Sequence, residues 1–258
     1  MAGHLPVDGA VTCEGIDRAL FLSQGFVILR GVVPPELLQP VRSAYEVLVG
    51  RPRDLWRRQG SDTWDTSAQP RLNLKPYEEL GGVGLPIDES AAAAVELWCH
   101  PNLQRASSQL LGIPDAGVTE MMLMCNPVAF EGPSSFHRDF SAPHSAPIEA
   151  YIDLNKEGST RYLQWNLCLH DDKVLGLVPR SHLLMNTSDQ NARMSADQSG
   201  HMPGAVQTQL RAGDAAVYMM PILHAGLHYS PVRRRTVHGG EHCATSHASG
   251  AAALAARV

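Results

Sequence analysis

The pattern of apolar and polar residues at the front of the chain changes twice within a short distance. From Ile16 to Gln24 the apolar residues recur three and four positions apart, which predicts a short amphipathic helix that Gly25 ends. The next residues, FVILRGV, are β-rich and predict a strand. Pro34 and Pro35 then open a second helix. Its predicted buried stripe consists of Leu37, Leu38, Val41, Ala44, Tyr45 and Leu48.

The helical pattern weakens after this point and then returns. Residues 51–90 contain enough Pro and Gly to predict loops around a short strand. From Ala91 to Leu111 the helical spacing is restored. We therefore expect a helical front over about residues 15–111, too short to form a domain of its own.

Beyond Gly112 the chain consists of short β-prone runs separated by turn residues. A parallel α/β fold would need a helix between successive strands, so these runs favour an antiparallel double sheet. The predicted fold is mainly β with flanking helices, and its core, over about residues 112–243, is a double-stranded β-helix, the cupin-like jelly roll. The runs are VTEMMLMCNP, SSFHRDF, IEAYIDL, RYLQWNLCL, VLGLVP, AVQTQL, DAAVYMMPILHAGLHY and RRTVHGG.

Two further segments complete a single predicted domain over residues 1–258. The polar stretch 186–203 is typical of a long surface loop. The tail 244–258 offers few side chains for packing, so we expect it to be loosely ordered.

Charge and cysteine content restrict the partners and the compartment. The formal net charge is −5 and the isoelectric point is about 6.2, so no overall basic field attracts nucleic acid or an anionic membrane surface. No stretch approaches the ~20 apolar residues that span a bilayer. The five cysteines are widely separated, and the N-terminus lacks the pattern of a secretion signal. We therefore expect a cytoplasmic protein with reduced thiols and without a nucleic-acid or membrane partner.

Histidine is the residue type that offers chemistry. The chain contains twelve histidines, whereas the phosphate-loop, nucleophile-elbow and H-E-x-x-H signatures do not occur. Two histidines and one carboxylate form the ligand set of non-haem Fe(II) oxygenases. An H-x-D segment on a strand supplies two of these ligands, because residues i and i+2 project to the same side. Two such segments occur, about as many as chance produces, so their context has to separate them.

The two H-x-D segments differ in their surroundings. His170–Lys173 is polar throughout and lies between two apolar runs, which predicts an exposed hairpin turn. His137 and Asp139 instead lie between Phe136 and Phe140 at the start of a strand, where a ligand at the rim of a barrel is expected. This second pair is the metal candidate, and the alternative is a His–Asp pair that helps to close a loop.

A third ligand has to come from a distant strand, and His224 is the best candidate because it ends an apolar run. Arg235 follows eleven residues later, and an arginine one strand further on suits bidentate capture of a carboxylate. The alternative for Arg233–Arg235 is an exposed basic turn. Pro231 and a nearby glycine disfavour a helix that would pair His224 with His228. We expect His228 either in the pocket or on the surface.

Several segments match the motifs of one known family in order and spacing. FHRDF is similar to an H-x-D segment, and VLGLVPRSH to a P-G-S-H motif that follows an apolar strand. RAGDAAVYMMPILHAG and RRRTVH are similar to the strands that carry the distal histidine and the arginine for a keto acid. With the opening GFVILRGVVPPELLQPVRSAYEVL, the chain resembles the phytanoyl-CoA dioxygenase family of Fe(II)- and 2-oxoglutarate-dependent oxygenases over most of its length.

The resemblance implies a role for each matching residue. It implies that His137, Asp139 and His224 bind Fe(II). It also implies that Arg235 binds the distal carboxylate of 2-oxoglutarate, with Arg234 as the alternative if the turn is one residue shorter.

Three more residues fall in segments that contact the co-substrate in this family: Trp165, Met122 and Lys75. Two positions depart from the family pattern. Gly226 stands where relatives frequently have a serine hydroxyl near the co-substrate, and Arg180 replaces the glycine of P-G-S-H. The first departure removes one polar contact with the co-substrate, and the second changes only a turn.

The activity implied by the resemblance is hydroxylation of an unactivated C–H bond of a small molecule, with specialised metabolism as one setting. O2 and 2-oxoglutarate are consumed, and succinate and CO2 are released. Asp139 fills the position that a halide would need, which favours hydroxylation over halogenation, while desaturation, ring closure and epimerisation stay open.

For this enzyme we expect a small-molecule substrate and a monomer or a homodimer. Two other classes of protein are kept as alternatives. A jelly-roll metal protein without oxidative chemistry could be an isomerase or a small-ligand binding module, because fold does not fix function. Such a protein would not need Arg235. The other alternative is an interaction protein that has lost its activity, against which the intact His137, Asp139 and His224 argue.

Overall fold

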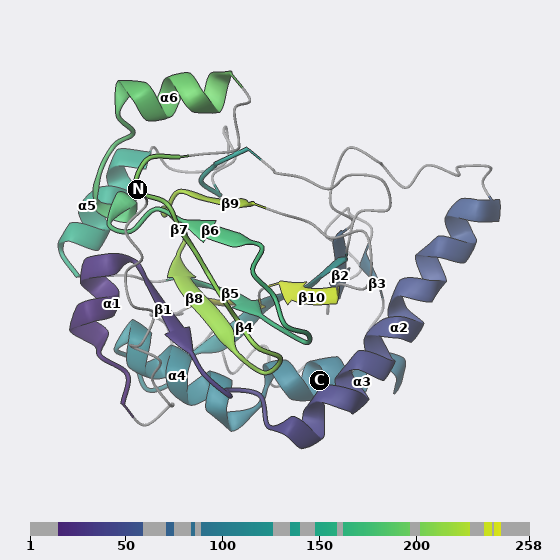
Figure 1. The fold of residues 1–258 in the computed structure, drawn as a ribbon. Helices are drawn as coiled ribbons and strands as arrows, with labels where there is room; N and C mark the ends of the chain where they lie inside the picture. Colours follow the sequence, from purple (N-terminus) through teal and green to yellow (C-terminus); the bar gives the residue numbers. More distant parts are fainter. Residues whose placement is uncertain are drawn as a thin grey trace.

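Two largely antiparallel β-sheets face each other at the centre of the molecule, and helices cover the outer side of the larger sheet (Figure 1). The structure is a computed structural model that describes residues 15–58, 71–74, 84–85, 89–125, 135–139, 148–158, 162–196, 202–227, 235–238 and 240–243. Within these ranges the architecture combines antiparallel sheets with flanking helices. It is compatible with the predicted jelly-roll core.

The front of the chain folds in the predicted order. Helix α1 (Arg18–Gln24) starts where the side chain of Asp17 accepts a hydrogen bond from the backbone N–H of Leu20. The helix ends at Gly25, whose φ of 85° lies in the left-handed region. Strand β1 (Phe26–Leu29) follows directly and becomes one edge of the larger sheet.

Helix α2 (Pro35–Arg58) begins at the predicted proline and buries the predicted stripe. The side chains of Val41, Tyr45 and Leu48 are each 1% exposed. The prediction of loops from residue 51 is wrong over residues 51–58, because Pro52 lies inside the helix without ending it. A proline removes one backbone hydrogen bond, and a long helix that packs along one face can tolerate that loss.

The predicted helical stretch from Ala91 to Leu111 is two helices rather than one. A single 3-10 turn, η1 (Glu89–Ala91), leads into α3 (Ala92–Trp98). Helix α4 (Pro101–Leu111) then starts after His100, whose side chain caps its first turn. The break falls at the proline because a proline at the first helical position needs no hydrogen-bond acceptor.

Among the residues that the structure describes, the larger sheet has eight strands and the smaller sheet three. The order in the larger sheet is β1-β8-β5-β10-β4-β2-β3, and β11 pairs with both β4 and β5. The order in the smaller sheet is β7-β6-β9. The larger sheet contains β2 (Arg71–Leu74), β3 (Gly84–Leu85), β4 (Gly117–Cys125), β5 (Tyr162–Leu167), β8 (Ala215–Met219), β10 (Arg235–His238) and β11 (Gly240–Cys243). The smaller contains β6 (Leu175–Leu177), β7 (Val206–Gln207) and β9 (His224–Gly226).

Strand alternation divides the core into two layers. On β8, Ala215, Val217 and Met219 pack in the cluster that includes the helices. The residues between them, Ala216 and Tyr218, pack with side chains of the smaller sheet. The larger sheet therefore has one face toward the helices and one toward the smaller sheet (Figure 1).

Strand β5 follows the same rule next to β8. Leu163, Trp165 and Leu167 belong to the cluster that includes the helices. Gln164 and Asn166 alternate with them and are also buried, so they lie on the side that faces the smaller sheet.

Two segments form helices that the hydrophobic pattern does not predict. IEAYIDL, predicted as a strand, forms α5 (Ile148–Lys156), because its apolar residues fit a spacing of three and four as well as they fit alternation. The predicted surface loop 186–203 contains α6 (Ser188–Ser195). A capping box between Thr187 and Gln190 starts α6, which is a sequence signal that the polarity of the segment concealed.

The last part of the core also differs in detail from the prediction. DAAVYMMPILHAGLHY, predicted as one run, forms β8 in the larger sheet and β9 in the smaller sheet, joined by residues 220–223. Strand β11 lies largely beyond the last predicted run and pairs with β4 and β5. The tail 244–258 lies outside the described residues.

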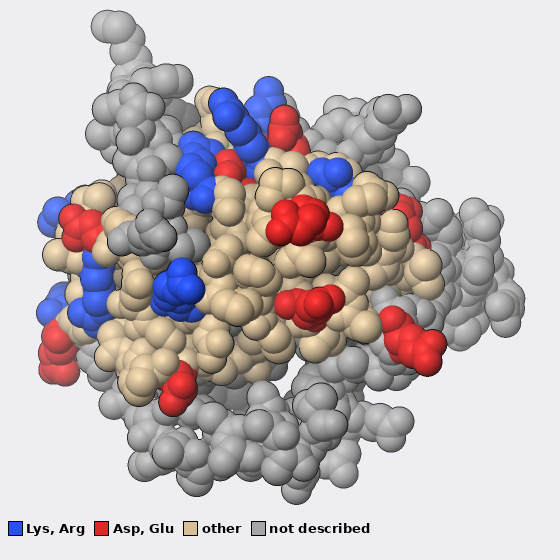
Figure 2. Space-filling model, turned by 90° about the horizontal axis from the view of Figure 1, so that it is seen from below, with Lys and Arg blue, Asp and Glu red and all other residues tan. Residues whose placement is uncertain are grey.

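The surface beneath the helices carries both signs of charge. Figure 2 shows acidic side chains over the centre and right of this face, and basic side chains together with further acidic ones along its upper and left edges. On the described part of the face the signs are mixed, in agreement with the net charge of −5. None of the helices in the described ranges has the length and apolar character needed to cross a membrane.

Gly25 allows a test of how α1 is joined to the sheet. Gly25→Ala should lower the free energy of unfolding by about 2–5 kcal/mol, because alanine is strained at this φ and its Cβ would collide with the imidazole of buried His182. Gly31→Ala is the control: its φ is 57°, but no atom lies within 4 Å of the added Cβ, so the loss should be about 1–2 kcal/mol. Urea unfolding measures both, and equal losses would contradict the role of the His182 contact.

Candidate metal centre

His137 and His224 are joined through their backbones before their side chains meet. The N–H of His137 donates to the carbonyl of His224 over 2.9 Å, and the N–H of His224 donates to the carbonyl of His137 over 3.0 Å. Two residues that exchange both hydrogen bonds in this way lie directly opposite each other in an antiparallel pair. Their imidazole rings leave the backbone side by side, with centroids 4.4 Å apart.

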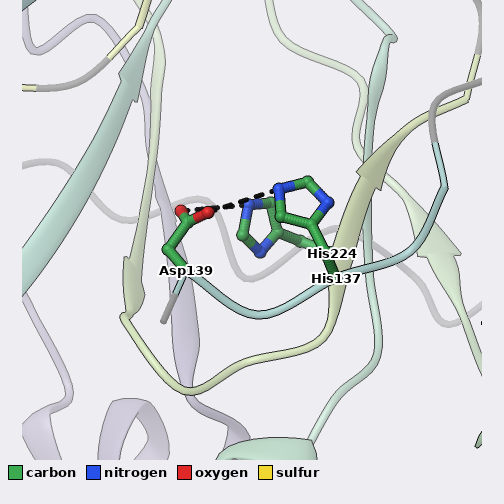
Figure 3. A group of neighbouring side chains, drawn as sticks. All are labelled: His137, Asp139 and His224. Carbon is green, nitrogen blue, oxygen red and sulfur yellow. Dashed lines mark ion pairs between the residues drawn. The ribbon is translucent and has the colours of Figure 1, made fainter. Parts of the chain in front are cut away.

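The carboxylate of Asp139 lies between the two imidazoles (Figure 3). Its Oδ1 is 3.3 Å from Nε2 of His137, and its Oδ2 is 3.3 Å from Nε2 of His224. The three possible ligand atoms all lie within 4.8 Å of one another. Within the described ranges, this is the one group of histidine, cysteine and carboxylate side chains close enough to hold a metal ion.

Backbone carbonyls fix the tautomers of both histidines. Nδ1 of His137 lies 2.9 Å from the carbonyl oxygen of Ser135, and Nδ1 of His224 lies 3.1 Å from that of Ile222. A carbonyl only accepts, so each Nδ1 carries a proton, and each neutral ring presents the lone pair of Nε2 to Asp139. Two lone pairs and a carboxylate repel each other unless a cation or a proton lies between them. This arrangement is typical of metal-binding histidines, and the donor set suits Fe(II).

The environment keeps Asp139 ionised. Burial alone would raise the pKa of Asp139. Hydrogen bonds from His137 and His224 and the charge of His224, which act when a proton lies between each Nε2 and the carboxylate, and a hydrogen bond from Gln164 hold that pKa well below its usual range. A metal ligand has to be a carboxylate rather than a carboxylic acid, so this shift favours metal binding.

Two strands of the larger sheet support the ligands from behind. Gln164 on β5 is 8% exposed, and its Nε2 donates to Oδ2 of Asp139. Tyr218 on β8 pairs with Gln164 in the strand register, and the centroid of its ring lies 5.2 Å from that of His224. These two residues were not among the predicted site residues. The signal for Gln164 was a polar residue that alternates with apolar ones in YLQWNL.

Arg138, between the two ligands of the H-x-D segment, ties this segment to two other parts of the chain. Its Nη1 donates to the carbonyls of Ser181 and Pro221, and its Nη2 donates to that of Leu184 over 2.9 Å. Nε and Nη2 both donate to the side-chain oxygen of Asn186. Burial lowers the pKa of Arg138 to about 10, so the guanidinium stays charged at neutral pH and its hydrogen bonds remain charge-assisted.

The ligands differ in how far solvent reaches them. The side chain of His224 is 8% exposed, whereas those of His137 and Asp139 are 40% and 35% exposed. One ligand is therefore buried, and the other two are partly exposed to solvent. Ligands on one side of a metal leave positions on the other side for further molecules.

Trp165 is a correction to the implied site. It is 1% exposed and packs in the cluster that includes the helices, while its neighbour Gln164 contacts Asp139. Alternation along β5 therefore places Trp165 on the face away from Asp139. The side chains that face the site from this strand are those of Gln164 and Asn166.

Two of the remaining residues implied for the co-substrate, Arg235 on β10 and Met122 on β4, lie on strands of the larger sheet. The backbone of Arg235 pairs with Cys125, and that of Met122 pairs with Asn73. Lys75, Arg234 and His228 lie outside the described residues.

The second H-x-D segment is not the exposed hairpin turn that its polarity predicts. Asp172 is 4% exposed, accepts a hydrogen bond from the N–H of Val174 over 2.7 Å, and forms an isolated bridge with Leu210. The segment connects β5 of the larger sheet to β6 of the smaller one, and buried backbone groups there need the aspartate as a partner. Asp172 is thus a structural residue.

The backbone of Arg180 has a conformation that suits the glycine found at this position of the P-G-S-H motif. Arg180 has a φ of 66°, the one left-handed value among the described residues that are not glycine. Its N–H donates to the carbonyl of Gln24 over 2.9 Å, which joins this turn to the end of α1. The departure from P-G-S-H therefore keeps the turn and adds strain to it.

The family of the chain follows from its sequence as a whole. The model of the phytanoyl-CoA dioxygenase (PhyH) family matches residues 21–236. The chain therefore belongs to the phytanoyl-CoA dioxygenase family, as the motifs predicted. No curated protein matches it significantly.

Solved structures with the same fold share little sequence with the chain. HygX from Streptomyces hygroscopicus, with nickel and 2-oxoglutarate bound, is 14% identical with a TM-score of 0.60, over 90% of this chain and 88% of that one. EctD from S. alaskensis, with 2-oxoglutarate and 5-hydroxyectoine, is 15% identical with a TM-score of 0.59, over 95% and 83%. The alpha-ketoglutarate-dependent carbocyclase SnoK from nogalamycin biosynthesis is 17% identical with a TM-score of 0.58, over 91% and 87%.

The hydrogen bond from Gln164 can be tested through metal affinity alone. Gln164→Leu should weaken Fe(II) binding about tenfold to a hundredfold, because Asp139 loses the partner that orients its carboxylate. Gln207→Leu is the control, since this exposed glutamine only donates to the carbonyl of Lys173. Anaerobic competition with a chromophoric chelator measures both. Parental affinity in Gln164→Leu would show that the contact does not orient Asp139.

Proposed function

We propose that this protein is a non-haem Fe(II)- and 2-oxoglutarate-dependent oxygenase that hydroxylates an unactivated C–H bond of a small molecule. The observation that carries the proposal is the geometry of His137, Asp139 and His224, in which two oriented Nε2 lone pairs and an ionised carboxylate converge. Membership of the phytanoyl-CoA dioxygenase family supports the same chemistry. We also propose that the two sheets form a complete double-stranded β-helix.

The residues of the chain have distinct tasks in this proposal. His137, Asp139 and His224 hold Fe(II) from one side, and the Ser135 and Ile222 carbonyls keep both rings in the required tautomer. When bound, Fe(II) with 2-oxoglutarate and O2 supplies the oxidation of the C–H bond, and the keto acid leaves as succinate and CO2. The opening beside His137 and Asp139 gives the substrate its approach.

Arg235 is proposed to bind the distal carboxylate of 2-oxoglutarate. The family resemblance supports this role. Strand β10 pairs with β5, the strand that supplies Gln164, but Val237 pairs with Leu167 and His238 with Asn166, so alternation gives position 235 the phase of Leu167 and not that of Gln164. A guanidinium can bind a carboxylate through two parallel hydrogen bonds. Arg234 is the alternative.

Ring closure is a second candidate outcome of the same oxidation. It is favoured by the likeness to the carbocyclase SnoK, and the link of that protein to nogalamycin biosynthesis agrees with a role in specialised metabolism. The metal centre would be the same for hydroxylation and ring closure, because only the fate of the oxidised substrate differs. Analysis of products by mass spectrometry, with a substrate library, Fe(II), 2-oxoglutarate and O2, separates the two outcomes.

Other features of the chain remain proposals. We keep a single domain over residues 1–258, a monomer or homodimer, and the cytoplasm as its compartment.

The assignment of the metal ligands can be tested without a substrate. Anaerobic Fe(II) with 2-oxoglutarate should give the parent protein the weak visible absorption of a chelated keto acid, and His137→Ala should abolish it because one of three ligands is missing. His170→Asn, in the other H-x-D segment, is the control and should keep the absorption. Absorption of parental strength in His137→Ala would overturn the assignment and revive a protein without oxidative chemistry.

The two arginines can be separated by titration of 2-oxoglutarate into the Fe(II) form. Arg235→Gln should cost on the order of 2–5 kcal/mol, or roughly a thirtyfold to several-thousandfold rise in Kd, because a charge-assisted contact is lost. Arg234→Gln should do much less, since adjacent residues of a strand project to opposite faces. A larger loss in Arg234→Gln would move the site by one residue, and small losses in both would argue against 2-oxoglutarate.

A further inference from the structure

The hydroxyl of Ser181 is inserted into the hydrogen-bond ladder of the smaller sheet, next to the metal centre. Strands β6 and β9 pair in a register that sets Leu177 opposite His224, so the next opposed residues are Val178 and Leu223. The N–H of Val178 donates to the carbonyl of Leu223 over 2.9 Å, as in a regular antiparallel pair. The reciprocal bond is replaced: the N–H of Leu223 donates to Oγ of Ser181 over 2.8 Å, and this hydroxyl donates to the carbonyl of Val178 over 2.7 Å. A side chain thus takes the place of one direct backbone hydrogen bond.

The peptide unit that Ser181 contacts also orients the ring of His224. The carbonyl of Ile222 and the N–H of Leu223 belong to one planar peptide, so a hydrogen bond at one end restricts the direction of the other. That carbonyl lies 3.1 Å from Nδ1 of His224 and leaves the lone pair of Nε2 for a metal ion. The hydroxyl of Ser181 is therefore linked to a metal ligand through a single rigid peptide.

The backbone of Ser181 is tied to the segment that carries the other two ligands. Ser181 opens a 3-10 turn, η2 (Ser181–Leu183), and is 4% exposed. Its carbonyl accepts a hydrogen bond over 2.8 Å from Nη1 of Arg138, the residue between His137 and Asp139. One buried residue therefore contacts the peptide that precedes His224 and the segment that pairs with it. This holds the hydroxyl in a fixed place relative to all three ligands.

We propose that Ser181 is a positioning residue of the metal centre, whose hydroxyl sets the direction of the Ile222 carbonyl and through it the angle of the His224 imidazole. The inference rests on the proposed function only as far as Fe(II) binds at this centre, because the co-substrate plays no part in it. A serine with a purely structural role would contribute to stability and leave the ligands in place. The two roles therefore differ in what the loss of the hydroxyl changes.

Ser181→Ala tests the effect of the hydroxyl on metal binding. Without it, the N–H of Leu223 and the carbonyl of Val178 can pair directly, because a buried backbone group left without a partner is costly. This pairing turns the peptide and with it the ring of His224, so the affinity for Fe(II) should fall about tenfold. Anaerobic competition with a chromophoric chelator measures the affinity. The visible absorption of the Co(II)-substituted protein, which depends on ligand geometry, should change as well.

Two further variants separate the hydroxyl from general packing. Ser181→Thr keeps the hydroxyl and adds a buried methyl group, so it should lower the Tm, while the Fe(II) affinity stays within about twofold of the parent and the Co(II) absorption is unchanged. Thr208→Val is the matched control. Thr208 is 3% exposed, and its hydroxyl donates to the carbonyl of Leu175 on β6 over 3.0 Å. Its loss should lower the Tm and leave both metal measurements at parental values.

The contrary outcomes are distinct. Parental Fe(II) affinity and Co(II) absorption in Ser181→Ala would refute the inference. Equal weakening in Ser181→Thr or in Thr208→Val would refute it too, because side-chain size or general loosening of the smaller sheet would then be the cause. If Ser181→Ala does not fold, Ser181→Cys carries the same comparison, since a thiol fills a similar space and accepts hydrogen bonds only weakly. A parent protein that binds neither Fe(II) nor Co(II) would instead refute the proposed function, and the inference with it.

Discussion

The pair of backbone hydrogen bonds between His137 and His224 is the constraint on which the metal centre depends. It brings together two segments that are far apart in the chain and sets both imidazole rings side by side. Asp139 follows two residues later and falls between the rings, while Arg138 anchors the same segment to neighbouring loops. The ligand geometry is therefore present in the backbone without a contribution from the metal, as preorganised sites require.

The larger sheet supports this geometry because each of its central strands serves two environments. On β5, Trp165 packs toward the helices and Gln164 toward Asp139. The apolar layer fixes the strand in place, and the polar layer can then hold a carboxylate at a defined angle. A slip of the strand by one residue would exchange the two layers, so packing against the helices also determines which side chains reach the metal centre.

Local signals in the sequence were sufficient for much of the fold and for the ligands. The cap at Gly25, the proline that opens α2 and the H-x-D context of His137 each depend on a few neighbouring residues. What the sequence missed depends on long-range pairing. Trp165 was assigned to the co-substrate because alignment gives a position along a strand but not the face toward which it points. Asp172 looked exposed because its bridge partner, Leu210, lies far along the chain and outside any strand.

The strands that carry the metal centre are short, and this affects how long a bound ion would stay. Strand β9 (His224–Gly226) has three residues, and the segment that carries His137 joins it through a single bridge. Local opening of such an element requires far less free energy than unfolding of the larger sheet. Opening would separate His137 from His224 while the helix-covered core stays folded. The rate of metal exchange would then follow the opening of this bridge and of the hydrogen bonds by which Arg138 anchors the same segment, and global stability would be a poor guide to metal retention.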